Sequence, residues 1–394
     1  MSDVNDLSPQ GFQVAGVHAG LKIEGKKDLA LIYSQTPCQV AAAFTTNTVK
    51  AAPVLYCQKV VQRGTPVHAV VINSGNANAC TGDAGLWHVK QEAQAVSQIF
   101  GNAADEVLVL STGVIGVPLP IERIVQGITK AAERVEESAW TDAAQAIITT
   151  DTHPKIVSLK SPAGYTITGI AKGSGMISPN MATMLAVVCT DASLSPELME
   201  QVPQIWNQTF NRIVVDGDMS TNDTVLLLAN GASGVGVDEE GDFLQICQQV
   251  CTQLAMSIVR DGEGATKLVT IRVSGGSSRD AVEKIARAIA TSPLCKTTFY
   301  GADPNWGRII CAAGYAGADF NPEKSSLFLT NGVQTILLFE HEQGGEYDEA
   351  AAIALMETDE WEIHLALGEG ESETWLWTCD LSHEYVTING HYRT

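Results

Sequence analysis

One segment of the chain combines residue types that could carry out acyl chemistry. Residues 172–185 read KGSGMISPNMATML. Two glycines followed by Pro179 and Asn180 predict a tight loop, and an apolar strand follows the loop directly. A strained loop can direct a threonine hydroxyl at the carbonyl carbon before it, which gives an ester by an N→O acyl shift. Hydrolysis of that ester would cut the chain between Ala182 and Thr183.

The cut would give Thr183 the two groups that a nucleophile needs. Its new α-amine, with a reference pKa of about 7.7–8.0, could take the proton from its own hydroxyl. Such a nucleophile needs no histidine, and the eight histidines of the chain form no evident triad. The residues alone also allow a structural interpretation, in which a glycine-rich turn enters a buried strand and Thr183 is there for its β propensity.

Composition and charge exclude several classes of function. With 394 residues, 45% of them hydrophobic, the chain is long enough for a sizeable core and two domains. A net charge of −21 argues against nucleic acids and anionic membranes, because like charges repel. Nucleotide-binding glycine motifs are missing as well. The charge alone does not name a substrate.

The cysteines and the acidic motifs do not predict a metal site. Nine cysteines are scattered without zinc-ligand spacing, which indicates free thiols in a reducing compartment. The acidic loop that begins at Asp216 departs from the calcium-loop pattern, because Leu227 stands where a glutamate is required. No secretory signal and no apolar run of membrane length is present. We expect a cytoplasmic protein that needs no metal.

Short apolar strands that alternate with amphipathic helices predict layered α/β structure. The expected strands are residues 67–72, 106–111, 166–171, 184–189, 224–229, 268–273, 326–330 and 361–367. The expected helices are residues 88–99, 120–137, 196–210, 243–259, 279–290 and 347–356. Ser195 and Ser278 are predicted N-caps. Because helices lengthen and strand spacing changes near residue 235, we expect an N-terminal lobe of residues 1–235 and a C-terminal lobe of residues 236–394.

Long strings resemble the ornithine acetyltransferases, the glutamate N-acetyltransferase family of arginine biosynthesis. Beside KGSGMISPNMATML, the strings that are similar to the family and follow its order are VINSGNANACTGDAG, STGVIGVPLP, TTDTHPK, NRIVVDGDMSTNDT, VRDGEGATKLVTI, YGADPNWGRI and the ending INGHYRT. The resemblance covers nearly the whole chain. It favours the chemical interpretation of Thr183 over the structural one.

The resemblance implies roles for residues that match the family's motifs. Thr183 would be both cleavage point and nucleophile, so that the Ala182–Thr183 bond breaks into an α chain of residues 1–182 and a β chain of residues 183–394. Thr112 and Gly113 match the pair that forms the family's oxyanion hole, in which a hydroxyl and a backbone N–H donate to the tetrahedral oxygen.

The resemblance also implies substrate-binding residues. Lys172 would pair with an α-carboxylate and Glu263 with a substrate ammonium. The pair Thr149 and Thr150 matches one substrate-binding position, and the sequence leaves open which of the two makes the contact. The remaining positions that match the family's substrate-binding residues are Thr183, Asn389 and Thr394.

The function implied by the resemblance is a ping-pong transfer of the acetyl group from N-acetyl-L-ornithine to L-glutamate. It uses no metal or bound cofactor, and use of acetyl-CoA as a second donor stays open. The family's fold is an α/β sandwich that resembles the N-terminal-nucleophile hydrolases in layering but has its own topology, with a smaller C-terminal α/β domain. The cleaved chains would stay together, as α2β2 in many members. The alternatives are a self-processing threonine aminopeptidase or amidase, with water as acceptor, and a non-catalytic binding protein.

Overall fold

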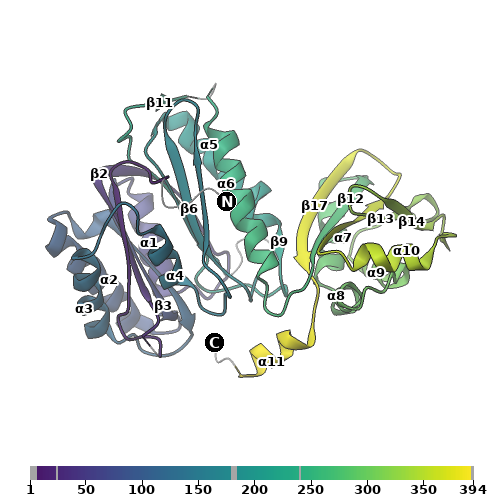
Figure 1. Ribbon diagram of the computed structural model, residues 1–394, viewed down its shortest axis with the longest axis horizontal. Helices are drawn as coiled ribbons and strands as arrows, with labels where there is room; N and C mark the ends of the chain where they lie inside the picture. Colours follow the sequence, from purple (N-terminus) through teal and green to yellow (C-terminus); the bar gives the residue numbers. More distant parts are fainter. Residues whose placement is uncertain (1–6, 24, 179–183, 239–240, 392–394) are drawn as a thin grey trace. The chain divides into compact units, whose positions relative to one another are not determined.

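The computed structural model in Figure 1 describes residues 7–23, 25–178, 184–238 and 241–391. The chain divides into two compact units, each with a sheet and a core of its own. The first unit comprises Met1–Asn211, Asp218–Ile258 and Arg393–Thr394, and the second comprises Arg212–Gly217 and Val259–Tyr392. Both units mix helices and strands, so the chain has the expected α/β fold class.

Eight strands form the sheet of the first unit. Its order is β4 (Val107–Val114), β3 (Val67–Asn76), β2 (Leu29–Phe44), β10 (Thr224–Ala229), β7 (Leu185–Thr190), β6 (Thr166–Lys172) and β5 (Lys155–Lys160), with β1 (Phe12–Val17) paired to β2. The sheet is mixed, because β3 is parallel to β4 and β10 is parallel to β7, whereas the other pairs are antiparallel. Two short strands, β8 (Ser193–Leu194) and β11 (Gly236–Val237), pair separately.

Helices cover both faces of this sheet. Val70 and Ile72 of β3 pack in one apolar cluster with α4 (Trp140–Ile147). Ala69 and Val71, which point the other way, pack in a second cluster with α2 (Gly82–Phe100) and α3 (Ile121–Ala132). A strand that is buried on both sides has a continuous apolar run, as residues 69–72 of β3, which read AVVI, show. The remaining helices of the unit are α1 (Ala52–Gln62), α5 (Pro196–Gln208) and α6 (Phe243–Arg260).

The second unit contains a sheet that buries only one face. Its order is β15 (Gln343–Gly344), β14 (Thr335–Glu340), β13 (Ser326–Thr330), β16 (Glu360–Ala366), β12 (Leu268–Gly276), β17 (Ser372–Cys379) and β9 (Ile213–Val214). Alternate residues of β12, such as Val269 and Ile271, are fully buried. The core beneath them is completed by α7 (Arg279–Thr291), α8 (Pro293–Tyr300), α9 (Trp306–Gly314) and α10 (Glu349–Met356). The period of two in the sequence of these strands reflects this single buried face.

The helix α6 belongs to the first unit up to Ile258. The expected boundary after residue 235 assigned this helix to the C-terminal lobe instead. The difference has a packing cause at Gly169 of β6, where an added Cβ would lie 2.7 Å from a methyl carbon of Leu254 and 3.2 Å from one of Val250. The apolar side of α6 therefore rests directly on the first sheet.

Helix ends show where local sequence decides the structure and where it does not. Ser195 and Ser278 cap α5 and α7 as predicted, each accepting an N–H three residues on. The predicted helix over residues 120–137 was wrong at its C-terminal end, because α3 ends at Ala132. Glu136 leaves the helix to exchange two backbone hydrogen bonds with Val14, at 2.9 and 3.0 Å. A long-range pairing overrides the helical pattern here.

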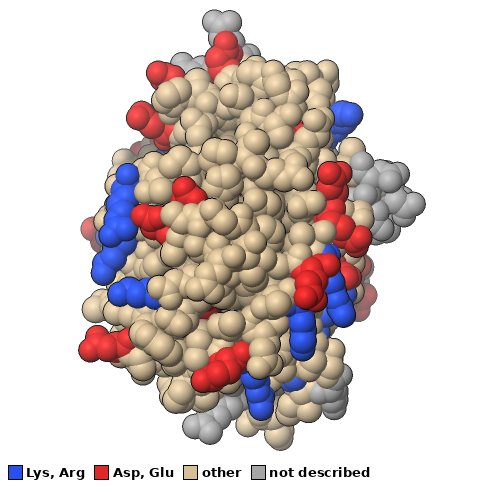
Figure 2. Space-filling model, turned by 90° about the vertical axis from the view of Figure 1, so that its left-hand side faces the viewer, with Lys and Arg blue, Asp and Glu red and all other residues tan. Residues whose placement is uncertain are grey.

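The negative charge is not spread evenly over the molecule. On the face shown in Figure 2, acidic and basic side chains are interspersed around a broad area without charged residues. In contrast, residues 335–394 carry many acidic side chains and a single Lys or Arg, Arg393. The excess of acids is thus concentrated toward the end of the chain.

One carboxyl group in the core should make stability depend on pH. Glu92 of α2 is fully buried, and neither carboxyl oxygen has a hydrogen-bond partner among the residues that the structure describes. Burial raises the pKa of Glu92 from 4.5 to about 8. Because the folded-state pKa is the higher one, the folded chain keeps a proton that the unfolded chain loses. The stability contribution is complete below pH 4.5 and is lost as the pH rises toward 8.

We expect Glu92→Gln to remove this dependence, since a buried amide stays neutral. The variant should gain stability relative to wild type between about pH 5 and about pH 8, on the order of several kcal/mol by the upper value. Thermal melting across that pH range tests this. Glu133→Gln, at an exposed position after α3, is the matched control and should follow wild type. A Glu92→Gln difference that stays constant with pH would contradict the assignment.

Candidate active site

The end of β4 carries the predicted pair Thr112 and Gly113. Its neighbour β3 makes a bulge there, since Asn76 pairs with both Thr112 and Val114 while Gly75 pairs with Gly113. Gly113 has a φ of +132°, and an added Cβ would lie 2.3 Å from the carbonyl carbon of Gly75. Both the backbone angle and the close approach require glycine at this position. The bulge therefore fixes the direction of the backbone at Gly113.

Lys172 at the end of β6 contacts Thr112, although 60 residues separate them in sequence. Its Nζ donates to Thr112 Oγ1 at 3.2 Å, and both residues are at most 5% exposed. Because the ammonium is the donor, the hydroxyl proton of Thr112 can donate to another acceptor. A threonine polarised in this way is a suitable donor for a developing oxyanion.

The carboxylate of Asp151 connects this cluster to the neighbouring loop. Its Oδ1 accepts from Lys155 Nζ at 2.6 Å and from the amide of Gly173 at 2.7 Å, and its Oδ2 accepts from the amide of Thr149 at 3.0 Å. Burial alone would raise the pKa of Asp151, but the charges of Lys172 and Lys155 and the Gly173 amide outweigh it and lower the pKa to about 2. Asp151 is therefore ionised throughout the neutral range.

The two candidate threonines have different surroundings. Thr150 Oγ1 and Ser174 Oγ are 2.7 Å apart, so the Thr150 hydroxyl is hydrogen-bonded to the segment that follows Lys172. Thr149 is held through its backbone amide on Asp151. Both threonines are half-buried beside the Lys172 cluster. That one of the two contacts the substrate stays a prediction.

Ala182 and Thr183 lie outside the described residues, and the description of the chain resumes at Met184. Leu185 begins β7 and pairs with Lys172 of β6 on one side and Thr224 of β10 on the other. The amide of Met184 donates to Asp223 Oδ1 at 3.1 Å. Burial raises the pKa of Asp223 well above its usual range. The predicted cut thus directly precedes a strand that is paired with Lys172.

Within the second unit, the predicted residues Glu263 and Asn389 come together. Asn389 lies on α11 (His383–His391), and its Nδ2 donates to Glu263 Oε2 at 2.7 Å. The loop of Glu263 packs tightly on this helix, because a Cβ on Gly264 would lie 2.6 Å from the amide nitrogen of Tyr385. Thr394 lies outside the described residues. The predicted residues therefore form one group in the first unit and one in the second.

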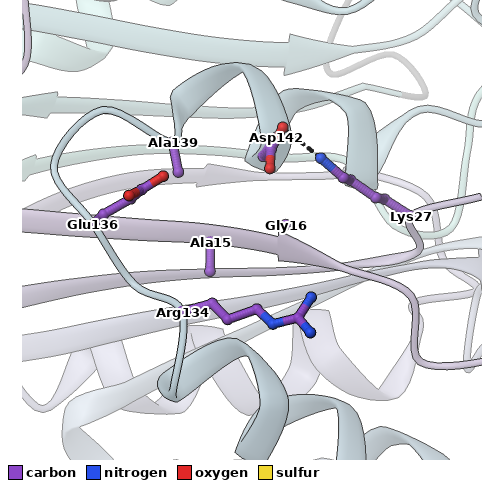
Figure 3. Close-up of a pocket in the computed structure, with 7 residues that line it drawn as sticks. All are labelled: Ala15, Gly16, Lys27, Arg134, Glu136, Ala139 and Asp142. Atoms are coloured by element: carbon purple, nitrogen blue, oxygen red, sulfur yellow. Dashed lines mark ion pairs between the residues drawn. The ribbon is translucent and has the colours of Figure 1, made fainter.

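A separate polar pocket of about 350 Å³ lies beside β1 in the first unit (Figure 3). The residues that line it are Ala15, Gly16, Lys27, Arg134, Glu136, Ala139 and Asp142. Lys27 and Asp142 form an ion pair across it. None of the predicted site residues lines this pocket, so its cavity is distinct from the Thr112–Lys172 cluster.

Comparison with known proteins places the chain in a family. The model of the ArgJ family matches residues 13–394. The chain belongs to the ArgJ family. The predicted resemblance to ornithine acetyltransferases of arginine biosynthesis is thereby confirmed at the level of the family.

Relatives of the ArgJ family match over almost their whole length. The arginine biosynthesis bifunctional protein ArgJ of Geobacter sulfurreducens is 46% identical, over 98% of this chain and 100% of its own. That of Caldanaerobacter subterraneus is 44% identical, over 98% of both chains. A solved ornithine acetyltransferase from Mycobacterium tuberculosis, in complex with ornithine, is 41% identical over 44% of this chain and 95% of that chain, with a TM-score of 0.42.

Sequence reasoning missed several charged residues around the ArgJ-family motifs. Asp151 and Lys155 lie inside the string TTDTHPK, but the sequence does not show that they are buried as an ion pair. Asp223 lies inside NRIVVDGDMSTNDT, whose acidic residues were considered only as a calcium loop. The one available signal was the spacing of four residues between Asp151 and Lys155, which is common on protein surfaces as well.

Metal sites and membrane helices are both missing from the described residues. They contain no group of three or more His, Cys, Asp or Glu side chains that could hold a metal ion. Among the helices in this part of the chain, none is long and apolar enough to cross a membrane.

Proposed function

We propose that this protein transfers the acetyl group of N-acetyl-L-ornithine to L-glutamate through an acetyl ester on Thr183. The observation that carries the proposal is the contact between Lys172 and Thr112 beside the glycine-only bulge at Gly113. This contact joins two strings of the ArgJ family at the strand end next to β7. Membership of a family whose relatives are named arginine biosynthesis proteins supports the choice of substrates.

In the proposed maturation, the hydroxyl oxygen of Thr183 attacks the carbonyl carbon of Ala182. The C–N bond between the two residues breaks, and its nitrogen takes a proton to become the α-amine of Thr183. Water then hydrolyses the resulting ester, which leaves a new carboxylate on Ala182. The products are an α chain of residues 1–182 and a β chain of residues 183–394.

In the proposed transfer, Thr183 attacks the acetyl carbon of the donor while its α-amine takes the hydroxyl proton. The Thr112 hydroxyl and the Gly113 amide donate to the oxyanion, each worth about 2.7–4 kcal/mol of transition-state stabilisation. Ornithine leaves with the proton from the α-ammonium. The amine of glutamate then attacks the ester carbon, loses its proton to the same α-amine, and departs as N-acetylglutamate while Thr183 regains its hydroxyl proton.

Lys172 and Glu263 have the charges to recognise an amino acid in this scheme. The ammonium of Lys172 would pair with the α-carboxylate, and the Glu263 carboxylate, held by Asn389, would pair with a substrate ammonium. Thr149 or Thr150, Asn389 and Thr394 would complete the binding of substrate. We propose in addition that no metal or bound cofactor takes part, and acetyl-CoA remains a candidate second donor.

The test is to give the purified protein N-acetyl-ornithine labelled in the acetyl group, with and without glutamate. We expect labelled N-acetylglutamate to form at least about tenfold faster than free acetate, because the amine outcompetes water when it is bound. Mass spectrometry of both products measures this ratio. Release of acetate at the same rate with and without glutamate would show an amidase instead and overturn the proposal.

A further inference from the structure

The loop between β1 and β2 wraps around a buried carboxylate. Asp28 is fully buried and accepts four consecutive backbone amides. The donors are the amides of Ala19 at 2.5 Å, Gly20 at 3.1 Å, Leu21 at 2.7 Å and Lys22 at 2.9 Å. Four charge-assisted hydrogen bonds hold the backbone of this loop in one conformation. The backbone from which the Lys22 side chain extends is thereby fixed in position.

The Lys22 side chain reaches a distant peptide at the candidate site. Its Nζ donates to the carbonyl oxygen of Ile148 at 2.6 Å, across 126 residues of sequence, and to that of Lys27 at 3.0 Å. The Ile148 carbonyl belongs to the same peptide unit as the amide of Thr149, which donates to Asp151 Oδ2. One peptide is therefore held at its oxygen by a cation and at its nitrogen by an anion.

We propose that Lys22 is a positioning residue of the acetyl-transfer site, which clamps the Ile148–Thr149 peptide together with Asp151 and so sets Thr149 and Thr150 for substrate binding. The inference rests on the proposed function. Asp151 links the clamp to the rest of the site, because the same carboxylate accepts the amide of Gly173, next to Lys172.

The charge of Lys22 should be lost at mildly alkaline pH. The pKa of Lys22 is lowered from 10.5 to about 8, mainly by burial; the charges of Lys172 and Lys26 act in the same direction, whereas those of Asp28 and Asp151 oppose it. Below pH 8 the ammonium makes a charge-assisted bond to the Ile148 carbonyl, and above pH 8 that bond weakens. Substrate affinity should therefore fall on the alkaline side. The α-amine of Thr183 would act in the opposite sense, because it serves as a base only when deprotonated.

The experiment compares three variants of the full chain with wild type. Lys22→Met removes the charge at similar length, Lys22→Arg keeps a charge that does not titrate, and Lys90→Met alters an exposed lysine of α2 as the control. We expect Lys22→Met to raise KM about tenfold with little change in kcat. The KM of wild type should rise above pH 8, whereas that of Lys22→Arg should stay level.

A second measurement is independent of catalysis. Hydrogen exchange of the peptide containing Thr149 should be faster in Lys22→Met than in wild type and Lys90→Met, since the clamp loses its cation. Unchanged exchange, or a wild-type KM that does not rise above pH 8, overturns the inference. A wild type that forms no N-acetylglutamate overturns the proposed function, while faster exchange in Lys22→Met would still show the clamp. If Lys22→Met fails to fold, the wild-type and Lys22→Arg pH profiles decide.

Discussion

Thr183→Ala is expected to yield one uncut chain of 41.9 kDa, where wild type yields two fragments. The variant lacks the hydroxyl that forms the ester and the group that carries the acetyl. Both cleavage and transfer should stop, with kcat lowered by more than about 10⁴-fold, as for other enzymes that lose their nucleophile. Intact-mass analysis of the purified proteins measures the cleavage, and the acetyl-transfer assay measures the rate.

Thr183→Ser is the matched variant, since it keeps the hydroxyl and the position of the α-amine. It should still cut itself and still become acetylated, although more slowly. In wild type incubated with N-acetyl-ornithine, one acetyl mass should appear on the fragment that begins at residue 183. A Thr183→Ala protein that is cut like wild type, or a label on the other fragment, would refute the assigned nucleophile.

Gly113→Ala is expected to abolish most of the activity while Thr183 is intact. The added Cβ would lie 2.3 Å from the carbonyl carbon of Gly75 and 2.5 Å from the amide nitrogen of Asn76. Both are backbone atoms and cannot rotate away, so β3 and β4 must separate at the bulge. The shift moves the Gly113 amide and the Thr112 hydroxyl together, and we expect kcat to fall about 10²–10³-fold or more.

Gly116→Ala provides the control for this prediction. Gly116 follows on the same segment and also has a positive φ, +79°, but an added Cβ would meet nothing within 4 Å. Its replacement should cost about 1 kcal/mol of stability through backbone strain and leave kcat close to wild type. Equal effects of the two substitutions on kcat, or a wild-type kcat in Gly113→Ala, would show that catalysis does not depend on the bulge.

The sequence predicted strands well where side-chain burial follows a regular pattern. The predicted residues 224–229 coincide with β10, whose burial is continuous, and the predicted residues 326–330 coincide with β13, whose burial alternates. The long strand β2 gave no such signal, because the polar segment between Tyr33 and Cys38 interrupts its apolar residues. In the structure a shift of register with β3 absorbs this segment, and Ser34 Oγ donates to the Thr36 carbonyl.

The candidate site shows the same limit of sequence reasoning. Motif strings indicated Thr112, Lys172 and their neighbours, but the contacts among them depend on strand pairing over long distances in sequence. Lys22 and Ile148 are 126 residues apart and are joined by a side chain that meets a backbone carbonyl. Every residue has a backbone carbonyl, so a lysine that donates to one leaves no pattern in the sequence. Only the folded structure shows the clamp.

The position of β7 has a consequence for how the protein can be made. This strand is hydrogen-bonded to β6 on one side and to β10 on the other, and the proposed cut before Thr183 assigns β6 to one fragment and β7 with β10 to the other. Folding of the uncut chain would be a first-order process. After cleavage, refolding from denaturant would require two chains to meet, so its rate would depend on protein concentration. The uncut precursor would thus fold as a single chain, whereas the mature enzyme, once denatured, would have to reassemble from two chains.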